Sequence, residues 1–435
     1  MRFAPPVISA TLPCKLLESV TVIITTQAVL RPILSYITPT TKVKPAPDTL
    51  PEPSAEEQQR SRLLCAAIEQ ACAQNGGAIS FAQYMQMALY QPGLGYYSHG
   101  SQKFGASGDF ITAAEVSPLF AQCLARQIIE ISQPLDAFSI LEFGAGSGVM
   151  AADILLELES QDVLPEVYQI LEVSAELRQR QQDTIASRAP QLLARVVWLD
   201  DLPTNFVGVV LANEVLDAMP VECFRRRGDV IEQMQIRFEG GNLCSHYCPA
   251  DEAVSSAVAA IEQRREARLP DNYCSELNLF HRPWLEALFQ SIERGTVLLI
   301  DYGYGVNEYY HPERSLGTLM CHYQHRSHPD PLWCPGVQDI TSYVDFSEVA
   351  HAAVDAGFEI LGYTSQAAFL MSAGLAELHQ EQVSDDVLVQ VKLAQQIKTL
   401  TLPSEMGERF KVMGLGKGCD EVLRGFAMSD LRNRL

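Results

Sequence analysis

Three glycines and one carboxylate stand where a parallel sheet would present them to a small ligand. Gly144, Gly146 and Gly148 follow the apolar run 139–143, and Glu142 comes directly before the turn. Such glycines let the backbone turn tightly and approach a ligand closely, with a helix N-terminus behind them. The spacing is G-x-G-x-G and not the G-x-G-x-x-G of dinucleotide binding. It favours S-adenosylmethionine over a dinucleotide, because Glu142 can receive the cationic amino-acid end and no pyrophosphate needs a cradle.

Further carboxylates follow the next two apolar runs. Glu172 comes near the end of the second run, where a carboxylate can accept both hydroxyl groups of a ribose. Asp200 and Asp201 follow the third run and could accept from an adenine amino group. These positions are the carboxyl ends of strands, where ligands of open α/β sheets bind. With the glycines they predict a nucleotide-type cofactor, whereas the glycines alone would also fit a structural turn.

A second polar group, Asn213, Glu214 and Asp217, follows the fourth apolar run and is expected beside the reactive methyl group. Methyl transfer depends on positioning the acceptor in line with that group. A guanidinium acceptor is cationic, so carboxylates must orient and polarise it, ideally through two bonds at once. Glu214 and Asp217 are three residues apart and can share a face of a helical turn. We expect Glu214 to be the main orienting carboxylate and Asp217 to support it. The alternative is that both cap a helix and hold the loop.

Other candidates come from distant segments. Asp109 and Glu115 could cover the cofactor or enter the acceptor pocket. His325 and Asp345 could complete a lid or accept a proton, with ordinary loop hydrogen bonding as the alternative. Asp301, at the end of the fifth strand, is expected to shape the pocket floor.

The elements that must position these residues alternate short apolar runs with helical patterns. Strands are expected at 139–143, 168–173, 195–199, 208–212 and 296–301, and helices at 149–159 and 175–189. This alternation indicates βαβ units and a parallel sheet. An insertion at about 225–294, between the fourth and fifth strands, is predicted to hold a hairpin and helices at 252–267 and 283–292. After it come an irregular loop at about 303–345, a helix at 346–356, a strand at 358–364, helical segments to about 399 and a strand at 409–415.

The N-terminal part differs in composition. Residues 1–47 carry five basic side chains against one acid, and the 12-residue apolar stretch within them is too short to span a membrane. Residues 1–54 are expected to be a disordered leader, either a targeting segment or the result of a start codon assigned too early. Residues 55–135 are expected to form a helical cap unit, with helices at 55–73, 80–89 and 118–131, and residues 136–435 the main domain.

Charge and cysteine content exclude some classes of protein. The chain has 32 Lys and Arg against 53 Asp and Glu, a net charge of -21, which disfavours nucleic acid as a partner. Its eleven cysteines form no C-x-x-C pair, which is typical of a reducing compartment. No metal site is expected. The group around His246 lacks further ligands, and the residues around His322, His325 and His328 indicate an irregular loop with an active-site or packing role.

Several multi-residue motifs resemble one family, the MidA-type methyltransferases, which include a mitochondrial complex I assembly factor and bacterial relatives. They are GDFITAAEVS at 108–117, LEFGAGSG at 141–148, ANEVLDAMPV at 212–221, DYGY at 301–304 and MGERFK at 406–411. The chain departs from the family pattern at Ala114 and Ala145, where proline is usual, and at Ser147, where arginine is usual. The glycines are kept, so cofactor binding is expected to survive.

The resemblance implies an α/β, class I Rossmann-like methyltransferase fold and S-adenosylmethionine as cofactor. It also implies methylation of an arginine in a protein such as a respiratory complex I subunit. The chain would then lie in the cytoplasm of a bacterium or the mitochondrial matrix of a eukaryote, without stable membrane insertion. Two alternatives stay open: a methyltransferase for a small molecule, and a non-catalytic assembly factor that binds a client protein. The sequence predicts neither the oligomeric state nor the degree of methylation.

Overall fold

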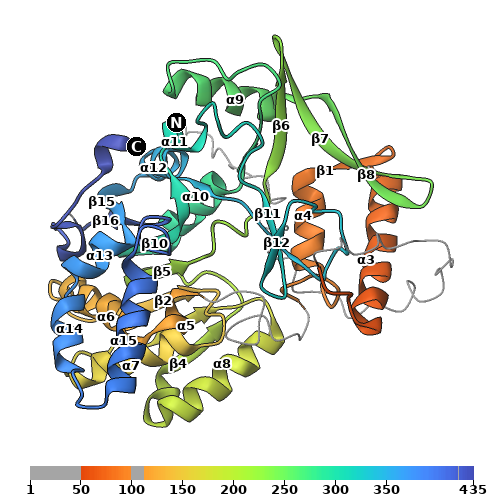
Figure 1. Cartoon of the computed structure of the whole chain (residues 1–435). Helices are drawn as coiled ribbons and strands as arrows, with labels where there is room; N and C mark the ends of the chain where they lie inside the picture. Colours follow the sequence, from red (N-terminus) through yellow and green to blue (C-terminus); the bar gives the residue numbers. More distant parts are fainter. Residues whose placement is uncertain (1–49, 99–111, 420) are drawn as a thin grey trace, which may run out of the picture.

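The computed structural model describes residues 50–98, 112–419 and 421–435. Residues 1–49 of the expected leader, and the candidate Asp109, lie outside the described residues. The described chain forms two bodies, one around a large mixed sheet and one around a smaller antiparallel sheet (Figure 1). No helix in the described part of the chain is both long and apolar enough to cross a membrane.

The large sheet confirms the predicted α/β fold. Its strands run in the order β15-β16-β10-β5-β2-β3-β4, and β14 pairs with the end of β10. All strands run in one direction except β16, which is antiparallel to both β10 and β15. The strands are β2 (Ser139–Phe143), β3 (Tyr168–Leu171), β4 (Val196–Leu199), β5 (Phe206–Asn213), β10 (Ile292–Tyr304), β14 (Val344–Asp345), β15 (Glu359–Ser365) and β16 (Phe410–Lys417). Strand order reverses between β2 and β5, so a crevice for a ligand is expected at their carboxyl ends.

Helices cover both faces of this sheet, so its strands read as continuous apolar runs. On one face, Ile140 and Val209 pack in a core with helices that include α6 and α7. On the other, Leu141 and Val210 pack against α10 and α12. Side chains of neighbouring residues in one strand therefore point to opposite faces of the sheet. The helices of this body are α5 (Ala113–Val116), α6 (Pro118–Ser132), α7 (Val149–Ser160), α8 (Ala175–Arg188), α10 (His281–Ser291), α12 (Phe346–Ala356), α13 (Gln366–Ser372), α14 (Leu375–Glu381) and α15 (Val387–Thr401). Short 3-10 helices are η1 (Pro190–Arg195), η2 (Arg424–Phe426) and η3 (Arg432–Arg434).

The smaller body joins the insertion to the N-terminal helices. Its elements are α3 (Ala55–Gln74), β1 (Ala78–Ser80), α4 (Phe81–Tyr90), β6 (Glu222–Arg227), β7 (Val230–Glu239), β8 (Asn242–Pro249), α9 (Glu252–Arg264) and β9 (Cys274–Leu277). Strand β1 pairs antiparallel with β7, with Ala78 opposite Arg237. Ser80 caps α4 through a capping box with Gln83, which confirms the expected cap. The structure thus divides residues 55–135, because α3 and α4 pack on the insertion while α6 packs on the large sheet.

The expectation of an irregular loop at 303–345 is wrong. The segment holds α11 (Val306–Tyr309) and a three-stranded sheet of β11 (Met320–Tyr323), β12 (Arg326–His328) and β13 (Asp339–Thr341). Cys321 and Ile340 pair across β11 and β13 and enter the core under α3 and α4. These strands have three or four residues each, so their alternation is too short to be recognised from the sequence.

Candidate active site

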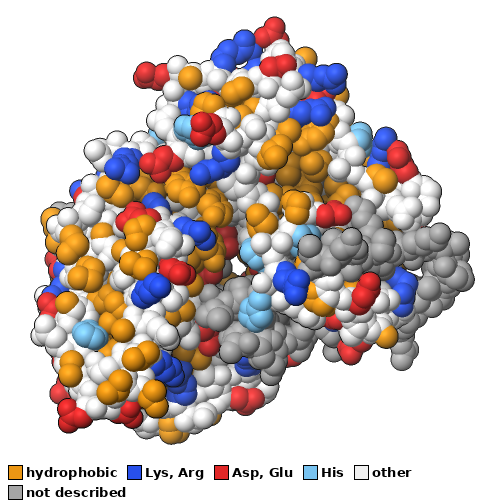
Figure 2. Space-filling model, in the orientation of Figure 1, with side chains coloured by type: hydrophobic (Ala, Val, Ile, Leu, Met, Phe, Trp, Pro, Cys, Tyr) orange, Lys and Arg blue, Asp and Glu red, His pale blue; other side chains and the backbone are white. Residues whose placement is uncertain are grey.

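A cavity of about 720 Å³ lies at the carboxyl ends of β2, β5 and β10, where the two bodies meet. The space-filling view is hollowed between the part that carries α13 to α15 and the part that carries α3 and α4 (Figure 2). The volume is within the range of small-molecule sites. Its walls come from the glycine turn 144–147, the segment 213–218, the end of β10, the segment 317–343 and Tyr90 and Tyr97 of the smaller body.

The three glycines have two different roles. Gly144 and Gly146 have positive φ angles, of 58° and 53°, and both line the cavity. Gly148 also has a positive φ, of 82°, but it caps α7 and is absent from the cavity wall. A Cβ atom at Gly148 would lie 2.9 Å from the Cα atom of Gln181. Gly144 and Gly146 therefore leave room for a ligand, and Gly148 leaves room for α8.

Glu142 and Glu172 both reach the cavity from the ends of neighbouring strands. The Tyr168 hydroxyl donates a hydrogen bond of 2.7 Å to Glu142. Burial raises the pKa of Glu142 to about 7, against the opposing effect of that hydrogen bond. Glu172 accepts a hydrogen bond of 2.9 Å from the backbone N–H of Ser174, and burial raises its pKa too. The structure thus places the two acids predicted for the cofactor beside the glycine turn.

Gln181, on α8, is a site residue that the sequence analysis missed. Its Nε2 atom donates to Glu172 at 3.0 Å and to the Gly146 carbonyl at 3.1 Å. Its Oε1 atom accepts from the Trp198 indole at 2.9 Å. Gln181 is fully buried, and it fixes the carboxylate and the turn relative to each other. A glutamine in a polar helix such as 175–188 carries no signal that separates it from an exposed residue.

Asp200 and Asp201 are not on the cavity wall, so the structure does not place either of them beside the other acids predicted for the cofactor. Both are exposed, and neither is on the cavity wall. Asp200 forms an ion pair of 2.6 Å with Arg178. Arg178 also donates to the carbonyls of Glu172 and Leu199, so it ties together the ends of β3 and β4. The carboxylate of Asp200 therefore helps Arg178 to hold the ends of β3 and β4 together.

Glu115 lies on the short helix α5 and lines the cavity, as expected for a residue that covers the cofactor. Its carboxylate accepts a hydrogen bond from the Ser147 hydroxyl. Ser147 occupies the position at which the resembled family usually has arginine. The contact between Glu115 and the glycine turn is thus made through a serine in this chain.

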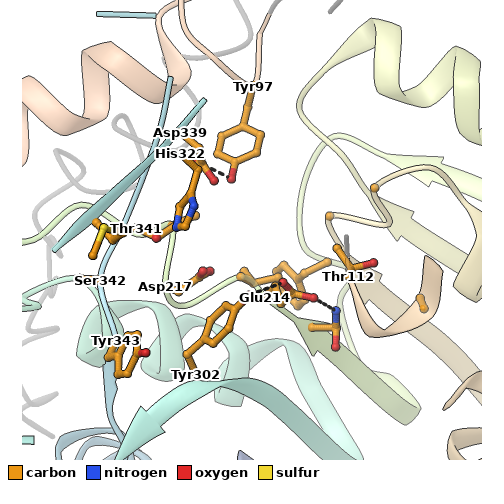
Figure 3. A pocket seen from close by; sticks show the side chains of 18 of the residues that line it. Tyr97, Thr112, Glu214, Asp217, Tyr302, His322, Asp339, Thr341, Ser342 and Tyr343 are labelled. Atoms are coloured by element: carbon orange, nitrogen blue, oxygen red, sulfur yellow. Dashed lines mark hydrogen bonds between the residues drawn. The ribbon is translucent and has the colours of Figure 1, made fainter. Parts of the chain in front are cut away.

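Glu214 directly follows β5 and has a left-handed backbone, with a φ of 53°. Its carboxylate accepts from the Asn213 amide at 3.1 Å and from the Tyr302 hydroxyl at 3.4 Å (Figure 3). Burial, with a smaller contribution from the Asp217 charge, raises the pKa of Glu214 to about 8. A left-handed backbone is uncommon for a residue with a side chain, and such strain concentrates at functional sites.

Asp301 holds the turn that carries these acids. Its Oδ2 atom accepts from the backbone N–H groups of Leu216 and Asp217, at 2.9 and 3.2 Å, and its Oδ1 atom from that of Tyr302. Asp217 is buried and lines the cavity, and its Oδ1 atom has no hydrogen-bond donor among the described residues. Burial raises the pKa of both aspartates, that of Asp301 to about 8. Asp301 therefore positions the turn, while Asp217 offers an acceptor for a ligand.

Asp339, on β13, is a third carboxylate of the cavity wall that the sequence analysis did not select. It accepts from the Tyr97 hydroxyl at 3.0 Å, across two segments far apart in the chain (Figure 3). Asp339 and His322 lie on one side of Asp217, and Tyr302 and Tyr343 lie on the other.

His325 is not on the cavity wall, contrary to expectation. It lies in the exposed turn between β11 and β12, with a φ of 61°. The histidine of this hairpin that lines the wall is His322, which pairs with Ser327 across β11 and β12. Asp345 is also off the wall and caps α12 by accepting from the backbone of Ser347 and Glu348. Within the described ranges, no three His, Cys, Asp or Glu side chains gather as a metal-ion site.

Comparisons with known proteins agree with this geometry. The sequence model of a family of S-adenosyl-L-methionine-dependent methyltransferases matches residues 123–364. The protein arginine methyltransferase NDUFAF7 of Mus musculus is 30% identical over 381 residues, 78% of this chain and 81% of that protein. The zebrafish (Danio rerio) protein of the same name is 28% identical over 77% of this chain and 82% of its own length.

A solved structure from Burkholderia thailandensis, with S-adenosyl-homocysteine bound, is 40% identical to this chain. It matches with a TM-score of 0.85 and covers 89% of this chain and 100% of its own. The family match extends over more than half of the chain and includes the glycine turn, Glu142, Glu172 and Glu214. The chain therefore belongs to the MidA-type family of S-adenosyl-L-methionine-dependent methyltransferases.

Proposed function

We propose that this chain is a protein arginine methyltransferase. The observation that carries the proposal is the convergence of Glu214, Asp217 and Asp339 on one cavity, next to the glycine turn. Three carboxylates that share a partly enclosed cavity favour a cationic ligand, and a guanidinium offers five N–H donors in a fixed plane. The names of the relatives, protein arginine methyltransferases, support the same acceptor.

The residues present fit the cofactor of the family. The backbone of Gly144 to Gly146 lines the wall without a Cβ atom at either glycine, and Glu172 is held with its carboxylate towards the same space. Glu142 is the acid next to the turn, suited to the ammonium group of the cofactor. When bound, S-adenosylmethionine supplies an electrophilic methyl group on a sulfonium.

In this proposal the acids of the second group bind and orient the acceptor. Asn213 and Asp217 each carry a buried oxygen that lacks a donor among the described residues, and a guanidinium would satisfy both. The attacking nitrogen must lose a proton when its bond to the methyl carbon forms. With a pKa of about 8, the carboxylate of Glu214 is matched to accept that proton near neutral pH.

The partner and the compartment follow from the relatives and from the family resemblance. The relatives are named as mitochondrial proteins. We extend this to a protein substrate such as a subunit of respiratory complex I, methylated in the mitochondrial matrix of a eukaryote or the cytoplasm of a bacterium.

The test is incubation of the purified protein and radiolabelled S-adenosylmethionine with lysate from a strain that lacks this gene. We expect label on a protein band, and mass spectrometry should place it on an arginine. Glu214→Gln should bind the cofactor with unchanged affinity and transfer no label. Asp385→Asn, the same chemical change at an exposed acid off the cavity wall, is the matched control and should transfer normally.

The alternatives predict other results of the same experiment. Label found only in the small-molecule fraction would support a methyltransferase for a small acceptor. Cofactor binding without transfer to any fraction would support the non-catalytic assembly factor. Either result would overturn the proposed arginine acceptor.

A further inference from the structure

The cavity separates its charges, with the acids on the inner wall and two arginines on its outer part. Arg314 and Arg409 line the same cavity as Glu214 and Asp217. Arg409 is exposed, and its guanidinium has no ion pair or hydrogen bond with any described residue. Arg314 is partly exposed and bonds only to backbone carbonyls, those of Glu308 and Tyr309, within the described chain. Neither cation is therefore neutralised by a carboxylate of the described residues.

Three tyrosines connect the acids to these arginines. The Tyr302 hydroxyl donates to Glu214, and the Tyr302 ring stacks on that of Tyr343 with 5.9 Å between centroids (Figure 3). The Tyr343 and Tyr304 centroids are 5.5 Å apart, and the Arg314 guanidinium lies 4.4 Å from the Tyr304 centroid. We call these three rings the aromatic shelf. The shelf gives a bound peptide a continuous apolar surface from the inner acids to Arg314.

Both arginines affect the same ring of the aromatic shelf, that of Tyr343. Burial raises the pKa of the Tyr343 hydroxyl, while the charges of Arg409 and Arg314 lower it. Arg409 comes directly before β16, and its carbonyl accepts from the backbone of Gly303 beside Tyr302. Both cations are therefore near the Tyr343 ring, and both line the cavity that would hold the ligand.

Other charges near the shelf do not cancel the pair. Lys411 is buried and lies 5.2 Å from the Tyr304 centroid, which adds positive charge. Glu308, whose backbone carbonyl accepts from Arg314, has its carboxylate 3.6 Å from Arg434 and so already has a partner. Glu408 accepts from the Ser365 hydroxyl and is exposed. The outer part of the cavity thus remains cationic although the whole chain is strongly acidic.

We infer that Arg314 and Arg409 form a subsite for a carboxylate that the peptide substrate carries close to its acceptor arginine. The inference rests on the proposed function, and it narrows the substrate class to arginines with an acidic neighbour. The three distances along the shelf, from Tyr302 to Tyr343, Tyr304 and then Arg314, are 5.9, 5.5 and 4.4 Å. Each is shorter than two residues of an extended chain, at about 3.3 to 3.6 Å per residue. The acidic residue should therefore stand fewer than about six residues from the acceptor. Arginine side chains recognise a carboxylate through two parallel hydrogen bonds, which adds geometric selectivity.

The test measures binding, so that it does not depend on turnover. Fluorescein-labelled peptides with one central arginine in a Gly-Ser background carry a single Glu, Gln or Lys at each of five positions on either side. Fluorescence anisotropy with S-adenosyl-homocysteine-saturated protein gives the affinity of each. At the preferred position the Glu peptide should bind about five- to tenfold more tightly than the Gln peptide, as expected for partly exposed charge pairs.

Variants then assign the preference to the two arginines. In Arg314→Ala and Arg409→Ala the ratio of Glu to Gln affinities should fall towards one, and in Arg409→Glu the Lys peptide should bind best. Lys392→Ala removes an equal charge from the exposed face of α15, off the cavity wall, and should leave the ratio unchanged. Affinity for S-adenosylmethionine should stay the same in all four variants.

Three results would overturn the inference. One is equal affinity for Glu and Gln peptides, or no binding of any peptide, by the unsubstituted protein. Another is a ratio that survives in both alanine variants. The third is a loss of S-adenosylmethionine affinity in those variants, which would assign the arginines to the carboxylate of the cofactor. Charge-selective binding without methyl transfer would instead contradict the proposed function and leave this subsite in place.

Discussion

The raised pKa of Glu214 leads to a specific pH dependence of methyl transfer. Burial and the nearby Asp217 charge raise the pKa of this carboxyl to about 8 in the protein without substrate. A cationic arginine needs the ionised form, because only a carboxylate can pair with a guanidinium and accept its proton. Activity at low substrate concentration should therefore rise as Glu214 loses its proton.

The magnitude follows from the titration of one group. With a pKa of about 8, about one molecule in ten is ionised at pH 7 and about nine in ten at pH 9, since kcat/KM reports the free enzyme. The value of kcat/KM should therefore rise about tenfold between pH 7 and pH 9. Its logarithm should climb with a slope near one below pH 8 and level off above it.

The assay is the initial rate of label transfer at substrate concentrations well below KM, from pH 6.5 to 9.5. Glu214→Gln should lower kcat/KM by about a hundredfold or more, the usual contribution of a positioned acid or base, and remove the rising limb. A flat profile in the unsubstituted enzyme would refute the reasoning. A rising limb near pH 8 that persists in Glu214→Gln would assign the titration to Asp301 or Asp217, which also have raised pKa values.

Four further changes test the cofactor side and the stability of the fold. Gly146→Val places a branched side chain at a φ of 53° on the cavity wall, so calorimetry should show S-adenosylmethionine binding weakened by about a hundredfold or more. Unchanged affinity would contradict the assignment of the site. Gln181→Leu removes the donor that holds Glu172, and the same titration should show a Kd about tenfold higher; an unaltered Kd would reduce Gln181 to a packing role. Asp301→Ala leaves three backbone N–H groups without this acceptor, two of them buried and one partly buried, so urea denaturation should show a loss of about 3 kcal/mol or more. A loss below about 1 kcal/mol would argue against its role in holding the turn. Burial raises the pKa of Glu142 from 4.5 to about 7, so the folded state binds this proton more tightly than the unfolded state does. The resulting stabilisation of the fold is fully present below pH 4.5 and is lost as the pH rises through 7. Tm should be lower at pH 8 than at pH 6, and this difference in Tm should be smaller in Glu142→Gln. An equal difference would assign the titration to another group.

Local signals account for what the sequence predicted best. Strand β2 and helix α12 have the expected bounds, because each has a clear start and end in its own residues. Asp345 caps α12 and Gly357 ends it in the left-handed conformation, and both residue types are typical of those positions. Glu142, Glu172 and Glu214 are predictable because they lie near the ends of apolar runs that are recognisable one at a time.

The residues that were missed depend on contacts between distant segments. Asp339 reaches the cavity only because β13 pairs with β11 and packs under α4, and Tyr97 meets it from 242 residues away. Gln181 contributes to the site because α8 packs closely on Gly148. No pattern in the sequence of α8 indicates this packing. His322 and not His325 lines the cavity because the hairpin of β11 and β12 turns at His325, and the sequence does not show where a hairpin turns. Tertiary pairing decides these positions, and a single sequence carries little signal for it.

The pairing of β1 with β7 also determines the order in which this protein can mature during translation. Ala78 meets Arg237 across that ladder, so the ribosome must add some 160 residues after β1 before its partner strand exists, a wait of roughly 8 to 30 seconds. During that interval the apolar faces of α3 and α4, which carry Leu64, Ile68 and Phe81, lack their cover. We therefore expect the nascent chain to bind chaperones until these partner segments emerge. A fragment that stops short of residue 230 should aggregate, and one that continues past residue 341, which adds β11 and β13 to this core, should gain a soluble N-terminal body.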